Sequence, residues 1–178
     1  ASDRYGNFDV FVMAANGGVA KRLTYHSADE YPFSFSYDNK SVVFGGVRQD
    51  EVNHRQFPTA SQPELYSVPV DGGRVDQIFT IPAEYVQSSK DGSKMIYHDK
   101  KGGENEWRKH HTSSVTRAIW LFDQKTNKHT QISTFYGENR NPVFADNEQN
   151  IYYLSEESGS FNVHKMPLKG SSKSEQVT

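Results

Sequence analysis

The chain has 178 residues, a formal net charge of −2 and no cysteine. Nucleic-acid-binding domains carry a basic excess that this sequence lacks, and the absence of cysteine excludes disulfides and cysteine-bound metals. Mean hydropathy is −0.80, yet 13% of the residues are aromatic. Apolar and aromatic residues recur with period two, which favours many short, half-exposed strands over disorder. No apolar segment approaches the roughly 20 residues of a membrane-spanning helix, so we expect no membrane span.

The first predicted element is a β-hairpin that ends at Thr24. A short apolar segment, 9–13, is followed by the turn residues Asn16-Gly17-Gly18 and by a second strand at 21–24. Glycine tolerates the positive φ that tight hairpin turns require. The two strands that should precede this hairpin in a four-stranded unit are missing from the sequence. We therefore expect residues 1–24 to be the closing hairpin of an incomplete unit.

Residues 25–80 are predicted to form the first complete four-stranded unit. Its first two strands are 32–36 and 41–46, joined by a short polar turn. The hairpin 64–80 supplies the last two strands, because its apolar residues alternate on both sides of an Asp-Gly-Gly turn. A long polar insertion, 47–62, separates the second strand from the third.

Residues 81–133 repeat this order. The strands 84–88 and 95–98 flank a Lys-Asp-Gly-Ser turn, and a hairpin at 118–133 closes the unit. A second long insertion, 99–117, again separates the second strand from the third.

Residues 134–178 form the last predicted unit. Its first two strands are 142–145 and 150–154, and the hairpin 162–178 closes it. The closing residues Thr24, Thr80, Ser133 and Thr178 recur at intervals of about 45–56 residues, a spacing typical of the four-stranded blades of a β-propeller. The predicted fold is thus all-β, a partial propeller of four-stranded antiparallel blades, with half a blade followed by three.

The turns and hairpins resemble the repeats of TolB and of the tricorn proteases, in the WD40-like group of propellers. The resemblance lies in the turns 36–40 and 89–94 and in the Val-Asp-Gly-Gly segment at 70–73. A narrower resemblance, to the N-terminal propeller of tricorn-type proteases, rests on four further segments: Glu106–Lys109, Thr116–Trp120, Asn141–Phe144 and Ile151–Leu154.

The tricorn resemblance implies a non-catalytic segment of a longer serine peptidase. In that family the propeller precedes a second propeller and a protease region of the tail-specific type, and it is thought to filter and channel peptides. The resemblance implies a periplasmic or secreted protein, with peptides or proteins and the remaining domains of the parent chain as partners. No nucleophile elbow, P-loop or zinc motif occurs in the sequence, so we predict no catalytic residue, metal or cofactor in this segment.

Two other functions stay open at this stage. One is a TolB-like envelope scaffold that binds a protein partner, and the other is a propeller lyase with a site in the central channel. A serine protease region elsewhere in the gene would favour the peptidase. A metal bound near the channel would support the lyase.

The predicted binding surface lies where both long insertions and the links between blades emerge from one face of the propeller. Guanidinium groups among aromatic and imidazole rings can bind carboxylates or peptide backbone. The candidate residues are Arg48, His54, Arg55, Trp107, Arg108, His110, Arg117 and Arg140. The alternative is that these loops pack on a neighbouring domain of the parent chain.

Half a blade plus three does not close a ring. An open propeller leaves unpaired strand edges and exposed apolar blade faces. We therefore predict that the chain is a fragment of a longer protein, or that it self-associates through its open blade edges.

Overall fold

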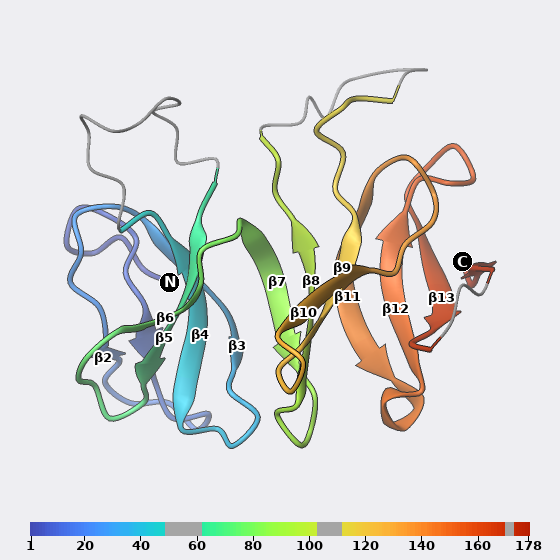
Figure 1. Ribbon diagram of the computed structural model, residues 1–178. Helices are drawn as coiled ribbons and strands as arrows, with labels where there is room; N and C mark the ends of the chain where they lie inside the picture. The colour runs from blue at the N-terminus through green and yellow to red at the C-terminus, as the bar shows by residue number, and fades with distance from the viewer. Residues whose placement is uncertain (49–61, 103–111, 170–172) are drawn as a thin grey trace. The chain divides into compact units, whose positions relative to one another are not determined.

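The computed structural model describes residues 1–48, 62–102, 112–169 and 173–178. The strands form four antiparallel sheets, one of two strands and three of four strands (Figure 1). Contacts along the chain divide it into two compact units, residues 1–83 and 84–178, and each unit is described by itself below.

The first unit contains the two-stranded sheet and one four-stranded sheet. The strand order of the larger sheet follows the chain, β3-β4-β5-β6. The strands of the unit are β1 (Phe11–Val12), β2 (Lys21–Arg22), β3 (Glu30–Phe35), β4 (Ser41–Gly46), β5 (Glu64–Pro69) and β6 (Asp76–Phe79). The Asp-Gly-Gly turn between β5 and β6 has positive φ at Gly72 (79°) and Gly73 (130°), as the tight turn requires.

The second unit contains two four-stranded sheets, ordered β7-β8-β9-β10 and β11-β12-β13-β14. A short 3-10 turn, η2 (Asp146–Glu148), joins β11 to β12. The strands are β7 (Ala83–Ser88), β8 (Lys94–Asp99), β9 (Ile119–Asp123), β10 (Lys128–Gln131), β11 (Asn139–Ala145), β12 (Asn150–Ser155), β13 (Asn162–Pro167) and β14 (Glu175–Gln176).

The turn between β3 and β4 and the turn between β7 and β8 repeat in atomic detail. The Ser36 hydroxyl donates to Asp38 at 2.7 Å, and the Ser89 hydroxyl donates to Asp91 at the same distance. These short polar side chains satisfy the turn backbone locally, which is why Ser and Asp favour turns. The repeat seen in the sequence therefore has a defined hydrogen-bonding role.

Three of the four closing residues of the repeat, Thr24, Ser133 and Thr178, also share a role. A hydroxyl oxygen near the end of the sheet accepts a hydrogen bond from the backbone N–H at the start of the third strand or its equivalent. This bond joins Val10 to Thr24, Ile119 to Ser133 and Val163 to Thr178, each at 3.0 Å. Each hydroxyl satisfies a backbone donor at a strand end that the ladder leaves free.

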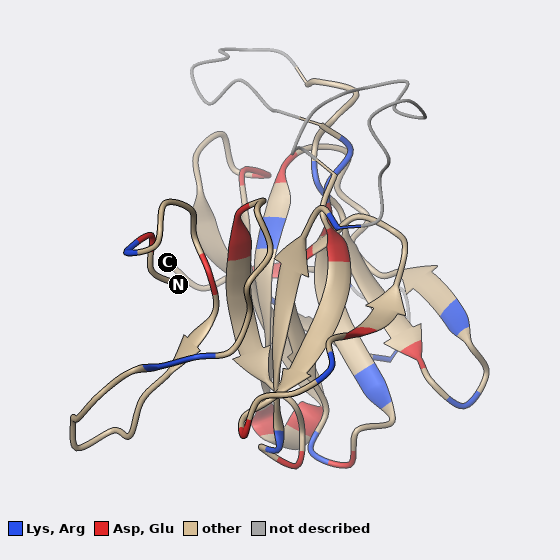
Figure 2. Cartoon of the chain, turned by 90° about the vertical axis from the view of Figure 1, so that its left-hand side faces the viewer, with Lys and Arg blue, Asp and Glu red and all other residues tan. Residues whose placement is uncertain are grey.

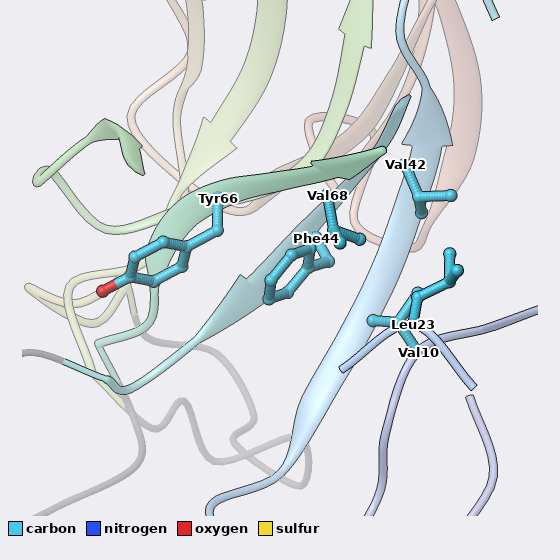
Figure 3. Packing of buried hydrophobic residues seen from close by; sticks show 6 residues of the cluster. All are labelled: Val10, Leu23, Val42, Phe44, Tyr66 and Val68. Atoms are coloured by element: carbon cyan, nitrogen blue, oxygen red, sulfur yellow. The ribbon is translucent and has the colours of Figure 1, made fainter. Parts of the chain in front are cut away.

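The core of the first unit lies between its two sheets (Figure 3). Phe44 and Val68 are fully buried, and the Phe44 and Tyr66 rings stack with centroids 5.7 Å apart. The cluster consists of Val10, Leu23, Val42, Phe44, Tyr66 and Val68. Inward-facing residues of the hairpin and of the four-stranded sheet thus share one core, as stacked blades do.

The core of the second unit joins its two sheets in the same way. Ile96 and Ile119 of one sheet and Ile151 of the other are fully buried. Tyr153, Met166 and Leu168 complete the cluster. Four antiparallel sheets, packed within each unit through alternating apolar residues, are those of a partial β-propeller with half a blade and three blades, as predicted.

The long insertions fall between β4 and β5 and between β8 and β9, the second and third strands of their sheets. Residues 49–61 of the first insertion and 103–111 of the second lie outside the described residues. The predicted blade ends at Thr80 and Ser133 stay predictions. Within the described ranges, no helix is long and apolar enough to cross a membrane.

Candidate binding surface

Three of the eight predicted binding residues are described: Arg48 in the first unit, and Arg117 and Arg140 in the second. Charged residues gather chiefly in the turns and at the ends of strands (Figure 2). The other five predicted residues lie outside the described part of the chain: His54, Arg55, Trp107, Arg108 and His110.

Arg48 follows β4 and pairs with a carboxylate inside its own unit. Its Nε donates to Glu30, whose side chain is fully buried at the start of β3. The Arg48 guanidinium carbon lies 5.7 Å from the ring centroids of both Phe44 and Tyr66, within cation–π range. The Arg48 backbone N–H donates to Glu64 at 3.4 Å. This arginine stabilises the end of its sheet and already binds a carboxylate of the chain.

Arg117 lies just before β9 and joins the two sheets of the second unit. Its Nη1 donates to Glu138 Oε1 at 2.5 Å, and its backbone N–H donates to Glu138 Oε2 at 3.1 Å. The Glu138 side chain is 2% exposed. The Asn139 N–H in turn donates to the Arg117 carbonyl at 3.0 Å. A buried carboxylate at the start of β11 is thus neutralised from the neighbouring sheet.

A buried histidine lies in the same part of the second unit. His98, near the end of β8, is 1% exposed and uses both ring nitrogens. Its Nδ1 accepts the backbone N–H of Asn141 at 3.0 Å, and its Nε2 lies 3.3 Å from Glu84 Oε2. A backbone amide can only donate, so Nδ1 carries no proton and Nε2–H donates to Glu84. The imidazole is therefore neutral in this arrangement.

The residues around His98 stabilise its neutral imidazole. Tyr85 stacks on the imidazole with ring centroids 5.3 Å apart. Burial lowers the pKa of His98 below its ordinary value, against the opposing effect of the Glu84 carboxylate. Burial alone would raise the pKa of Glu84, but the hydrogen bonds from His98 and Lys100 and the Lys100 charge lower it to about 2. Lys100 Nζ lies 2.7 Å from Glu84 Oε1.

Two residues beside His98 have left-handed backbone conformations. Tyr85 has φ of 52° and Asn141 has φ of 55°. Asparagine tolerates this region, but a tyrosine there is uncommon. In β11 the pairing register with β12 shifts between Arg140 and Val143, around Asn141. This bulge turns the Asn141 N–H toward His98, an arrangement typical of sites where a bulge redirects a group.

Arg140 differs from Arg48 and Arg117 because it has no acidic ion-pair partner among the residues that the structure describes. It pairs with Leu154 in the β11–β12 ladder. Its guanidinium carbon lies 4.1 Å from the ring centroid of Phe161, which is 43% exposed. Its Nε is buried without a hydrogen-bond partner among the described residues. An arginine held on an exposed ring can still bind a carboxylate.

Sequence reasoning named two of the arginines in these clusters and missed their partners Glu30, Glu84 and Glu138 as site residues. A signal for two of these glutamates does exist in the sequence, because a Glu-Tyr pair, Glu30-Tyr31 and Glu84-Tyr85, occurs at the start of two first strands. A charged residue where a strand enters a core suggests a buried ion pair.

The described groups form a structural network. Arg48 and Arg117 are paired with glutamates, Arg140 has no acidic partner in the described part of the chain, and the neutral His98 bonds to a carboxylate and a backbone amide. Among the described residues, no cluster of three His, Asp or Glu side chains could hold a metal ion. The chemistry available there is carboxylate binding by a guanidinium group beside an aromatic ring.

The chain resembles known propellers in sequence and in structure. The tricorn protease N-terminal β-propeller domain matches residues 1–178. Among curated proteins, none matches the chain closely enough to count as a relative.

Three solved structures illustrate the shared fold. Tricorn protease has a TM-score of 0.71 at 18% identity, over 94% of this chain and 16% of that chain. TolB from Acinetobacter baumannii has a TM-score of 0.68 at 13% identity, over 94% and 37%. An oligogalacturonate lyase in complex with manganese has a TM-score of 0.58 at 15% identity, over 90% and 41%. The chain thus spans well under half the length of each of these structures. By its match over the whole sequence, the chain belongs to the family of tricorn protease N-terminal β-propeller domains.

Proposed function

We propose that this chain is a non-catalytic propeller segment of a tricorn-like serine peptidase, acting in substrate access or in contact between domains. The observation that carries the proposal is the family match over residues 1–178. The described polar groups support it, because Glu138 and His98 are engaged in links between strands rather than aligned with a nucleophile.

Within this proposal, Arg140 and Phe161 bind the carboxylate and an apolar side chain of a peptide. The guanidinium is held on an exposed ring, and the outer face of β11 and β12 around it includes Val143, which is 42% exposed. A carboxylate that pairs with Arg140 would satisfy donors that have no acidic partner among the described residues. The other seven predicted residues stay proposed binding residues, each within its own unit; Arg48 and Arg117 would bind a peptide carboxylate only by exchanging their present partners Glu30 and Glu138.

The experiment is a binding and cleavage assay with unstructured fluorescent peptides that end in either a free carboxylate or an amide. We expect saturable binding, a preference for the free carboxylate, and no cleavage by mass spectrometry. The substitution Arg140→Gln should weaken peptide binding about tenfold, which is the effect expected from losing one charge-assisted hydrogen bond. Arg74→Gln is the matched control, because the Arg74 side chain is 90% exposed in the first unit.

The outcomes separate the alternatives. Peptide cleavage by the chain itself would contradict a non-catalytic role. Binding that is lost in both arginine variants, or in neither, would remove Arg140 from the site. If no peptide binds but the remaining domains of the parent protein bind the chain, the role is interdomain contact.

A TolB-like envelope scaffold is the second candidate, because the fold of TolB matches 94% of the chain. Under either proposal we place the protein in the periplasm or outside the cell, with a protein or peptide partner. A propeller lyase is the third candidate, and its test is uronate-polymer cleavage with and without added manganese. Light scattering tests self-association, since a dimer would have twice the 20.2 kDa mass of one chain.

A further inference from the structure

We infer that His98 makes the link between the two sheets of the second unit sensitive to acid: protonation of its Nδ1 breaks the Asn141 hydrogen bond and releases β11 from β8. The inference concerns the two contacts of a buried ring, Nδ1 with the Asn141 N–H and Nε2 with Glu84. It does not depend on the proposed function.

The chemistry of the ring determines the direction of the change. A proton added to imidazole can go only to the free nitrogen, here Nδ1. The protonated Nδ1–H would then face the Asn141 N–H at 3.0 Å, so that two donors oppose each other without an acceptor. Burial prevents water from taking the place of the lost acceptor. The N–H of Asn141 must therefore move away from the ring.

The hydrogen bond between His98 Nε2 and Glu84 remains after protonation. Nε2–H continues to donate to Glu84, and this bond strengthens when the ring carries a positive charge. Glu84 keeps its own charge through mildly acidic pH because its pKa is lowered to about 2. The imidazole consequently stays with β7 while the Asn141 backbone of β11 is displaced.

The charges that face His98 come from each element around it. Glu84 lies on β7, Lys100 follows β8, Arg117 precedes β9 and Glu138 precedes β11. Arg117 disfavours the charged ring, whereas Glu84 and Glu138 favour it. Lys100 and Arg117 are themselves paired with carboxylates, so the added proton meets a balanced set of charges. The free energy needed to protonate His98 is therefore set mainly by its burial and by the Asn141 N–H.

Only one of the three four-stranded sheets has a histidine at this strand position. Counting from the start of the second strand, His98 on β8 corresponds to Gly45 on β4 and Leu154 on β12. Neither residue can titrate. The first unit and the last sheet thus lack a protonatable group at this position, and acid should act on the contact between β8 and β11.

Hydrogen exchange at the Asn141 amide of the intact chain is the test, read as a protection factor from pH 8 to pH 4.5. We expect constant protection above about pH 6.5, the ordinary histidine pKa, and a loss of up to about tenfold per pH unit below it, because one proton is taken up. His98→Gln should abolish this pH dependence, since the amide does not titrate.

Two further variants distinguish the loss of the Asn141 hydrogen bond from a general loss of stability. Glu84→Gln removes the charge that favours the protonated ring and should move the onset to lower pH, whereas plain destabilisation would move it to higher pH. His129→Gln is the matched control: His129 lies in the same sheet, its Nδ1 is 2.8 Å from the Tyr97 hydroxyl, and it should leave the Asn141 profile unchanged. Protection of Asn141 that stays constant to pH 4.5, or that falls equally in His98→Gln, would overturn the inference.

Discussion

The two units differ at a strand position that they share. Gly45 on β4 and His98 on β8 each lie four residues after the start of their strand. In the first unit an added Cβ at Gly45 would lie 2.7 Å from the Phe33 ring, so a ring from β3 already fills the space. In the second unit the space holds His98 itself, with Tyr85 stacked on it. The same strand position is apolar and closed in one unit and polar and titratable in the other.

The two arginine pairs differ in a related way. Arg48 pairs with Glu30 of its own sheet, whereas Arg117 pairs with Glu138 across two sheets. Both carboxylates lie at the start of a first strand and are at most 2% exposed. A pair within one sheet supports local structure, whereas a pair between sheets supports the packing of neighbouring blades. Both sheets therefore have a buried acid at or next to the start of the first strand, and they differ in the source of the cation.

The largest expected effect comes from removing the cation that joins the sheets. Arg117→Met leaves Glu138 buried without its charge partner and should lower the free energy of unfolding by about 3–5 kcal/mol. Urea unfolding measured by tryptophan fluorescence checks this, because Trp120 lies on β9 of the second unit. The double variant Arg117→Met, Glu138→Leu should recover most of the loss. A single variant within 1 kcal/mol of the parent chain would show that the pair contributes little.

The next effect is on the pH dependence of stability. Glu84 has a pKa of about 2 in the folded chain, below its unfolded value near 4.3. The unfolded state therefore binds more protons in this interval, and the stability due to Glu84 is complete above about pH 4.5 and lost as pH falls toward 2. The loss should be on the order of 2–3 kcal/mol, since the side chain is mostly buried.

Glu84→Gln tests this window. The variant should be less stable than the parent chain at pH 6 but should approach it at pH 2.5, because most of the stability due to the Glu84 charge is lost by then. Urea titrations at a series of pH values give the two curves. Parallel curves from pH 6 to pH 2.5 would mean that the ion pair of Glu84 with Lys100 has no net effect on stability.

The sequence was enough to predict the strands and turns, because both depend on local patterns. Alternating residues mark β5, and Gly72 and Gly73 mark its turn. The partners of the arginines were not predictable, because they depend on which strands pair and in what register. Glu30 is 18 residues from Arg48, and Glu138 is 21 residues from Arg117. The contact of His98 with Asn141 depends further on a bulge 43 residues away.

The smallest expected effect tests the closed position in the first unit. Gly45→Ala places a methyl group against the Phe33 ring atoms at 2.7 and 2.9 Å, contacts that require the ring to move. Overpacking of this kind should cost about 1–3 kcal/mol. Phe33→Leu opens the space at its own cost, and Gly45→Ala should then be nearly neutral in that background. A double-mutant cycle by urea unfolding gives a coupling of about 1 kcal/mol or more if the two residues share the space. Additive effects would mean that Phe33 moves aside without penalty, and the two units would then differ at this position only in polarity.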